Sequence, residues 1–255
     1  MLNQINYQWR VTKYNPKFRD EFGHHTLIEE WTCPSQIGET INGKEFTFDD
    51  YLRVEAAYIN SVIKFMEESR IDSLRVLQLE CDRLEEEKIS HLYEKEFEKV
   101  VLKEDSVIDK NEIHLICKMV LRNLIWCNLY SKEFFVHFGW DYYMYIGSNV
   151  NCLTAIKFAK NNGLFVEECM SPYFITEDET VREIQWSEMG NSLIMGEEEL
   201  KNIPLNEYRK IFGLSEIHPV IGSFKIKKEQ VEFFQPFLKH KMDFEKYEYY
   251  FWGGN

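Results

Sequence analysis

Residues 134–146, with the sequence FFVHFGWDYYMYI, carry the clearest structural pattern in the chain. Aromatic and β-branched residues favour the half-buried surface of a sheet, so both ends of this stretch are predicted to be strands. Between them, 139–141 (Gly-Trp-Asp) is expected to form a short hairpin turn. Side chains alternate along a strand, which places Phe135 and His137 on one face and the remaining residues of 134–138 on the other. We expect one face to belong to the core and the face of His137 to be open to a ligand.

The chain after this hairpin continues as a helix over residues 152–162, which is predicted to end at Gly163, and a strand over 164–168. Before the hairpin, residues 110–130 carry apolar side chains almost all round a helix. We interpret them as a central helix that packs against the aromatic sheet. The predicted fold class is therefore α+β, with mixed, mainly antiparallel sheets and packed helices.

Two further helices are predicted within residues 1–105. Thr47 has the pattern of a capping residue for an amphipathic helix over residues 48–69, and the charged stretch 82–104 is expected to be a surface helix. The best internal break follows this stretch. It divides the chain into an N-terminal half, 1–105, and a C-terminal half, 106–255, which we expect to pack as one body through the central helix.

Composition narrows the class of protein. The chain has 255 residues, of which 44% are hydrophobic, and this argues against disorder. Its formal net charge of −13 repels phosphate backbones, so nucleic acid is not an expected partner. The six cysteines form no C-x-x-C pair, so the spacings typical of zinc-ribbon and thioredoxin-type sites are absent. The start of the chain has no secretory pattern, and the sequence has no apolar run long enough to span a bilayer, so we expect a cytoplasmic location and no membrane partner.

His137, Asp141 and Tyr143 are the candidates for catalysis. A histidine and a carboxylate on one hairpin can act as base and acid or bind a metal, in a tyrosine-rich pocket for a small molecule. The alternative interpretation is structural, with a histidine held on a sheet face and an aspartate that serves the turn. No nucleophile elbow, phosphate loop, dinucleotide fingerprint or H-E-x-x-H motif is present, so no cofactor is expected and the enzyme hypothesis ranks second.

His24 and His25 are the candidates for metal binding, because they lie near two acidic residues in a polar stretch. Adjacent side chains on an irregular loop seldom both reach one ion. We therefore expect these histidines to be ordinary loop residues and predict no metal site.

An acidic window covers residues 167–199, where ten acidic residues and one base, Arg182, give a net charge of −9. Its carboxylates are interleaved with aromatic residues, so they form either solvated loops or a recognition face for a basic protein. The predicted binding residues are Glu177, Asp178, Glu179, Trp186, Glu197, Glu198 and Glu199. In composition the chain is similar to cytosolic bacterial immunity or inhibitor proteins, a similarity that covers no defined segment. The leading hypothesis is a binding protein that sequesters or inhibits a basic protein partner.

Overall fold

The computed structural model describes residues 5–21, 24–26, 30–81, 84–88, 90–191 and 193–255. The chain divides into two compact units, Asn3–Tyr173 and Phe174–Asn255, and each is described here by itself. The boundary between these units differs from the predicted division at residue 106. That position lies beside a strand that pairs within the first unit, so both sides of it belong to one sheet.

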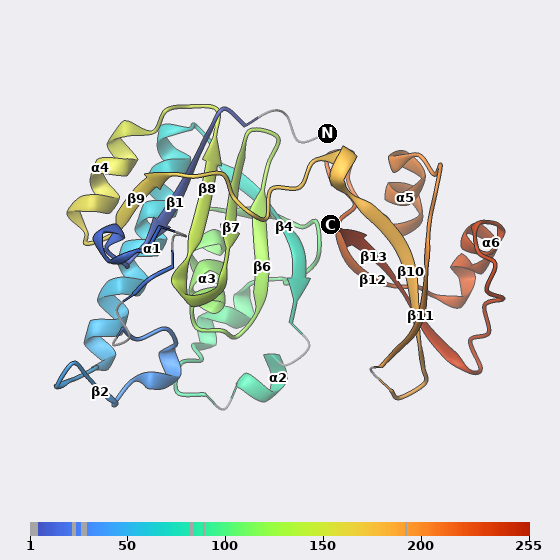
Figure 1. The fold of residues 1–255 in the computed structure, drawn as a ribbon, viewed down its shortest axis with the longest axis horizontal. Helices are drawn as coiled ribbons and strands as arrows, with labels where there is room; N and C mark the ends of the chain where they lie inside the picture. Colours follow the sequence, from blue (N-terminus) through green and yellow to red (C-terminus); the bar gives the residue numbers. More distant parts are fainter. Residues whose placement is uncertain (1–4, 22–23, 27–29, 82–83, 89, 192) are drawn as a thin grey trace. The chain divides into compact units, whose positions relative to one another are not determined.

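The first unit is built on a seven-stranded sheet in which every described pair of neighbours is antiparallel (Figure 1). Its strands, in spatial order, are β5 (Val107–Asp109), β4 (Ser73–Glu80), β6 (Trp126–Tyr130), β7 (Phe134–Phe138), β8 (Met144–Ser148), β1 (Tyr7–Thr12) and β9 (Phe165–Glu168). A separate small hairpin joins β2 (Thr40–Ile41) and β3 (Lys44–Glu45). Together with the second unit, these sheets and helices confirm the predicted α+β class.

Three helices cover one face of this sheet: α1 (Phe48–Glu68), α3 (Lys110–Leu121) and α4 (Leu153–Asn161). Their apolar sides share one core with Val11, Val136 and Ile146 of the strands. Both α1 and α3 begin at a capping residue, and for α1 it is the predicted Thr47. The Thr47 hydroxyl accepts the Asp50 N–H at 3.1 Å, and Asp109 begins α3 in the same way.

The predicted central helix over 110–130 is too long, because α3 ends at Leu121 and β6 follows at Trp126–Tyr130. The residues of β6 lie inside the sheet with both faces covered, and four of the five are buried. A strand that is apolar on both sides has no alternation, and its sequence cannot be distinguished from that of a buried helix.

The predicted surface helix over residues 82–104 is also wrong for most of its length. The described part of this stretch contains only the short α2 (Leu84–Glu87) and a 3₁₀ turn at Lys95–Lys99. Phe97 and Val100 are buried in the core, but they lie in and directly after this 3₁₀ turn rather than in an α-helix. Short charged helices are marginal in water unless one continuous face packs, and this segment has no such face.

The alternation predicted along β7 is confirmed, whereas the expected open face is not. Phe134, Val136 and Phe138 belong to the core beneath the helices, so Phe135 and His137 point to the opposite face. All five residues of β7 are nevertheless buried. The segment after β9 crosses this second face (Figure 1), and Ser171 within it contacts His137. A covered face leaves no room there for a ligand.

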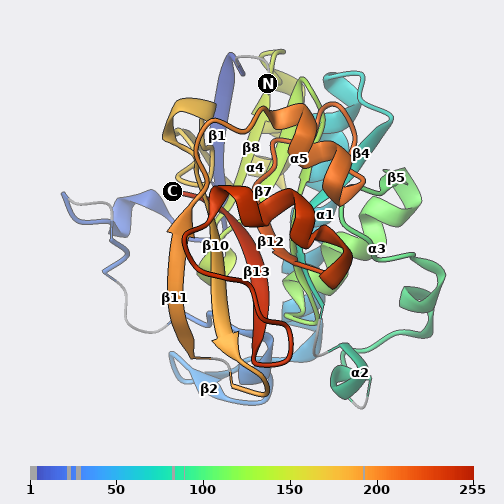
Figure 2. The same cartoon turned by 90° about the vertical axis from the view of Figure 1, so that its right-hand side faces the viewer.

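The second unit is a four-stranded antiparallel sheet with helices on one face (Figure 2). Its strands, in spatial order, are β11 (Ile194–Glu199), β10 (Val181–Glu188), β13 (Tyr247–Gly254) and β12 (Gly222–Lys225). Helices α5 (Leu205–Phe212) and α6 (Val231–Phe234) enclose a separate core that includes Ile184, Tyr208 and Phe251.

Candidate functional site

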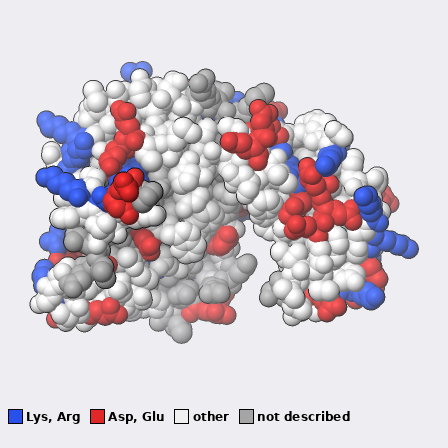
Figure 3. Space-filling view, in the orientation of Figure 1, with Lys and Arg blue, Asp and Glu red and all other residues white. Residues whose placement is uncertain are grey.

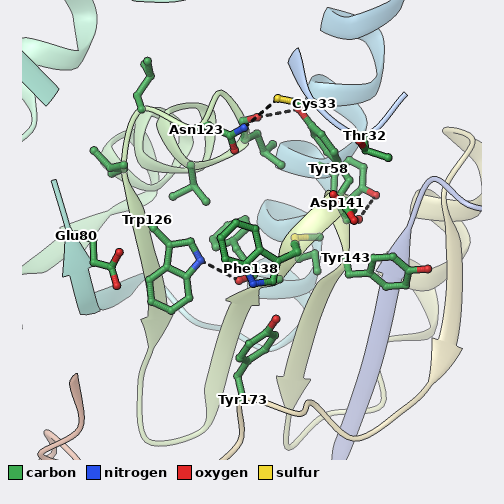
Figure 4. Close-up of a pocket in the computed structure, with 18 of the residues that line it drawn as sticks. Thr32, Cys33, Tyr58, Glu80, Asn123, Trp126, Phe138, Asp141, Tyr143 and Tyr173 are labelled. Atoms are coloured by element: carbon green, nitrogen blue, oxygen red, sulfur yellow. Dashed lines mark hydrogen bonds between the residues drawn. The ribbon is translucent and has the colours of Figure 1, made fainter. Parts of the chain in front are cut away.

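The first unit contains a pocket of about 890 Å³ at the end of the sheet where β7 turns into β8 (Figure 4). The turn itself, the connection from α3 to β6 and the end of β4 supply most of the lining, and Tyr173 closes it from below in this view. Seven aromatic residues line it: Tyr58, Trp126, Phe138, Trp140, Tyr142, Tyr143 and Tyr173.

The turn from β7 to β8 has an unusual backbone. Asp141 and Tyr142 both have positive φ, 54° and 62°, and the Tyr143 N–H donates to the carbonyl of Trp140 at 3.1 Å. Two successive left-handed residues are what a tight hairpin turn needs to match the twist of its strands. A bulky residue such as Tyr142 adopts this conformation only at a cost in free energy, so other contacts must hold it there.

The side chain of Tyr142 provides those contacts. Its hydroxyl donates to the carbonyl of Leu121 at 2.8 Å, and its ring packs edge-on against Trp31 with centroids 4.8 Å apart. The Tyr58 hydroxyl, from α1, donates to the carbonyl of Tyr142 at 2.6 Å. Burial raises the pKa of both hydroxyls far above their ordinary value, so they stay protonated. The turn is thereby fixed to α1 and α3, while Trp140 at its tip is 84% exposed.

The charged groups of the pocket are all acidic. Glu80 and Asp141 are the only charged residues in the described lining, and both are exposed. The remaining polar groups are uncharged, and among them the Asn123 amide donates to the sulfur of Cys33 at 3.4 Å. A ligand in this pocket therefore meets aromatic rings and carboxylates.

Of the three predicted catalytic residues, Asp141 and Tyr143 line the pocket and His137 does not. The His137 ring stacks on Phe135 with centroids 4.0 Å apart, and its Nδ1 lies 2.8 Å from the Ser171 hydroxyl. Burial lowers the pKa of His137 to about 3. The imidazole is neutral at physiological pH and enclosed, so the structure does not bring it together with Asp141 as an acid–base pair.

His24 and His25 face different surroundings. The exposed ring of His24 lies 3.3 Å from the carboxylate of Asp20, whereas His25 packs on the ring of Tyr14 with centroids 4.9 Å apart. Within the described ranges no group of three or more His, Cys, Asp or Glu side chains is arranged to hold a metal ion.

The predicted acidic residues 197–199 lie on β11, and strand alternation divides them between two faces. Glu197 and Glu199 are exposed, and Glu183 of β10 is directly opposite Glu199. Glu198 points to the helix-covered face, where its carboxylate accepts the backbone N–H groups of Lys239 and His240 at 2.7 and 2.8 Å. Its role is therefore structural.

The other predicted binding residues are divided in a similar way. Trp186 stacks on His240 with centroids 4.2 Å apart, on the same covered face as Glu198. Glu177 binds the guanidinium of Arg182 through two contacts of 2.8 and 2.9 Å, and Glu179 accepts the N–H of Thr176 at 3.1 Å. All three residues 177–179 are nevertheless exposed. Of the predicted set, Trp186 and Glu198 thus lie on the covered face, and the other carboxylates are exposed.

The hairpin of β10 and β11 also exposes apolar side chains that the sequence did not reveal as a group. We call this set the apolar tip: Met189, Leu193, Ile194 and Met195, which are 58, 65, 51 and 53% exposed. The carboxylates of Glu183, which is half-buried, and of Glu197 and Glu199, which are exposed, are called the acidic stem. In Figure 3, Asp and Glu side chains gather over the part of the second unit labelled β10 and β11 in Figure 1. Strand β11 is an edge strand that pairs only with β10 among the described strands.

Residues 181–252 match the model of a family described as a domain of unknown function, DUF7683. The match begins with β10 and ends within β13, so it covers most of the second unit. Comparison with curated proteins and with solved structures gave no match. In the described part of the chain, no helix combines the length and apolar character needed to cross a membrane.

Proposed function

We propose that this chain is a binding protein that sequesters or inhibits a basic protein partner through the hairpin of β10 and β11. The observation that carries the proposal is the combination, on one edge hairpin, of the apolar tip with the acidic stem. Exposed apolar patches rimmed by polar groups are typical of protein–protein contact sites. Burial of the tip would supply affinity, and the carboxylates would steer a positively charged partner into place.

The acidic stem supports this proposal because its charges are unfavourable in the free protein. Glu183 and Glu199 occupy directly opposite positions on neighbouring strands. Like charges in such positions repel one another. Glu199 also lies 2.9 Å from Lys201, and Glu183 accepts a hydrogen bond from Gln185 at 2.7 Å, which relieves part of the repulsion. Lysine or arginine side chains of a partner would relieve the rest.

The free edge of β11 provides a second means of contact. An edge strand offers unpaired backbone N–H and C=O groups, and an extended segment of a partner can add to the sheet there. Backbone pairing would fix the orientation of the partner. The alternating positions of the edge strand would then present Glu197 and Glu199 to the same face of the complex.

The test is quantitative capture of partners from the native lysate by the full-length chain. A stem variant carries Glu197→Lys and Glu199→Lys, and a tip variant carries Ile194→Ser and Met195→Ser. The control carries Glu96→Lys and Glu98→Lys, an equal change of charge at exposed positions of the first unit. We expect a basic protein that the parent and the control retain at low salt, that raised salt releases, and that both hairpin variants lose. Equal retention by the hairpin variants would refute the proposal.

A further inference from the structure

We propose that the pocket of the first unit binds a small organic cation, in which an ammonium or quaternary ammonium group is attached to an apolar body. This site is separate from the hairpin, and the inference does not depend on the proposed protein partner. The size of the pocket, its aromatic lining and its charge each point to this class of ligand.

The volume and lining suit a small molecule. Pockets that hold such ligands measure roughly 300–1,000 Å³ and are lined mainly by apolar and aromatic side chains with a few polar groups. This pocket has about 890 Å³ and the same kind of lining. In Figure 4, Trp126 and Tyr173 border the same open space, and the hydroxyl of Tyr173 points into it.

The charge selects the ligand. Glu80 and Asp141 are acidic, and no lysine, arginine or histidine belongs to the described lining. Neither carboxylate makes a hydrogen bond or ion pair with another described side chain. Burial lowers the pKa of Lys13, and Asp141 is close enough to that ammonium to oppose the shift, so Lys13 offsets part of the Asp141 charge, while Glu80 has no such neighbour among the described groups. The faces of aromatic rings are also negative, and they attract cations within about 6 Å of their centroids. An anion would meet repulsion from both kinds of group.

The protein already holds one ammonium group in this manner beside the pocket. The Lys13 Nζ lies 4.0 Å from the ring centroid of Tyr14 and 4.2 Å from that of Trp31, with the carboxylate of Glu30 at 3.2 Å. The Lys13 backbone N–H donates to the hydroxyl of Tyr58, which lines the pocket. Aromatic rings and a carboxylate thus bind a cation at one site of this unit, and the pocket presents the same groups with room for an external one.

The turn presents Asp141 in a fixed position before any ligand arrives. Tyr142 is fastened to α1 and α3, so the left-handed residue before it cannot move freely. In a preorganised site, little binding free energy is lost to ordering the side chains that contact the ligand. Trp140, at the exposed tip of the same turn, also lines the pocket, so its ring is available to a bound cation.

The experiment measures binding of three probes of similar shape to the full-length chain by tryptophan fluorescence and calorimetry. They are benzyltrimethylammonium, its neutral isostere neopentylbenzene, and the anion phenylmethanesulfonate. We expect saturable binding of the cation, at least roughly fivefold weaker binding of the neutral probe, and none of the anion, because cation–π and carboxylate attraction act on the cation alone.

Variants locate the site. Asp141→Asn removes the charge and keeps the turn, since asparagine tolerates positive φ. Glu80→Gln removes the other carboxylate. Each should weaken binding of the cation about fivefold and leave the neutral probe unaffected, whereas Asp178→Asn, the same change at an exposed site of the second unit, should alter neither. Equal affinity for cation and isostere, no saturable binding of the cation, or unchanged cation affinity in both pocket variants would overturn the proposal.

Discussion

Replacement of His137 by asparagine should remove a large part of the acid sensitivity of this protein. Burial lowers the pKa of His137 to about 3, against 6.5 for the free side chain. The unfolded chain therefore binds a proton between these values that the folded chain does not, and stability falls as the pH falls from about 6.5 to about 3. Each pH unit within that window corresponds to about 1.4 kcal/mol.

Between pH 7 and pH 5 the His137 contribution amounts to about 2 kcal/mol of lost unfolding free energy. His137→Asn places a neutral amide next to the Ser171 hydroxyl and has no charge to bury. The measurement is urea denaturation of both proteins at pH 7 and pH 5. The parent should lose about 2 kcal/mol more than the variant over this interval. Carboxylates that titrate in both proteins cancel in the comparison.

The control is His91→Asn, which changes an exposed histidine in the same way and should keep the pH dependence of the parent. A variant at position 137 that loses as much stability as the parent between pH 7 and pH 5 would refute the reasoning. Such a result would mean that the imidazole gains a proton inside the folded protein near its ordinary pKa. The face of the sheet that carries it would then be accessible to water.

Three further substitutions test the packing around the pocket and the sheet. Glu55→Gln removes one of two carboxylates that bind the buried Arg122 guanidinium, the one at 2.6 and 2.8 Å, and leaves Glu94 at 2.7 Å as the other, so it should lower the unfolding free energy by about 2 kcal/mol in urea denaturation. Gly147→Ala would place a Cβ 2.1 Å from the ring of Phe135, and should lower it by about 1–3 kcal/mol, read as a fall in the thermal midpoint. Asp109→Ala removes the cap of α3 and should cost about 1 kcal/mol in urea denaturation. Parent-like stability in any of them contradicts the corresponding contact.

Local patterns in the sequence predicted those parts of the fold that depend on neighbouring residues. The cap at Thr47, the end of α4 at Gly163 and the alternation along β7 each arise from a few consecutive residues, and the structure confirms them. The prediction of a helix over residues 126–130 was wrong because their neighbours in the sheet, rather than their own side chains, decide between strand and helix. Trp126–Tyr130 becomes a strand since β4 and β7 lie on either side of it.

The pocket depends on residues that the sequence separates widely. Asp141 and Tyr143 stood out because they lie in one aromatic hairpin, but Tyr58, Glu80 and Trp126 come from three other elements. No spacing rule connects them, since only the pairing of β4, β6, β7 and β8 brings their ends together. His137 was grouped with Asp141 by proximity in sequence. Strand alternation places the side chain of His137 on the face opposite to that of Phe138. Phe138 lines the pocket together with Asp141, so His137 points away from the pocket.

In the acidic window, the alternation of side chains along β11 decides which glutamates are exposed. The sequence IMGEEE of β11 contains no alternation of apolar and polar residues, so it does not predict which of these residues share a face of the sheet. Gly196 supplies the missing information, because a Cβ there would lie 2.4 Å from the ring of Trp186, which covers it from the opposite strand. Gly196 and Glu198 therefore share the covered face, and Glu197 and Glu199 must share the open one. A partner that recognises this hairpin can reach two of the three consecutive glutamates, and charge reversal at Glu198 would act on folding rather than on binding.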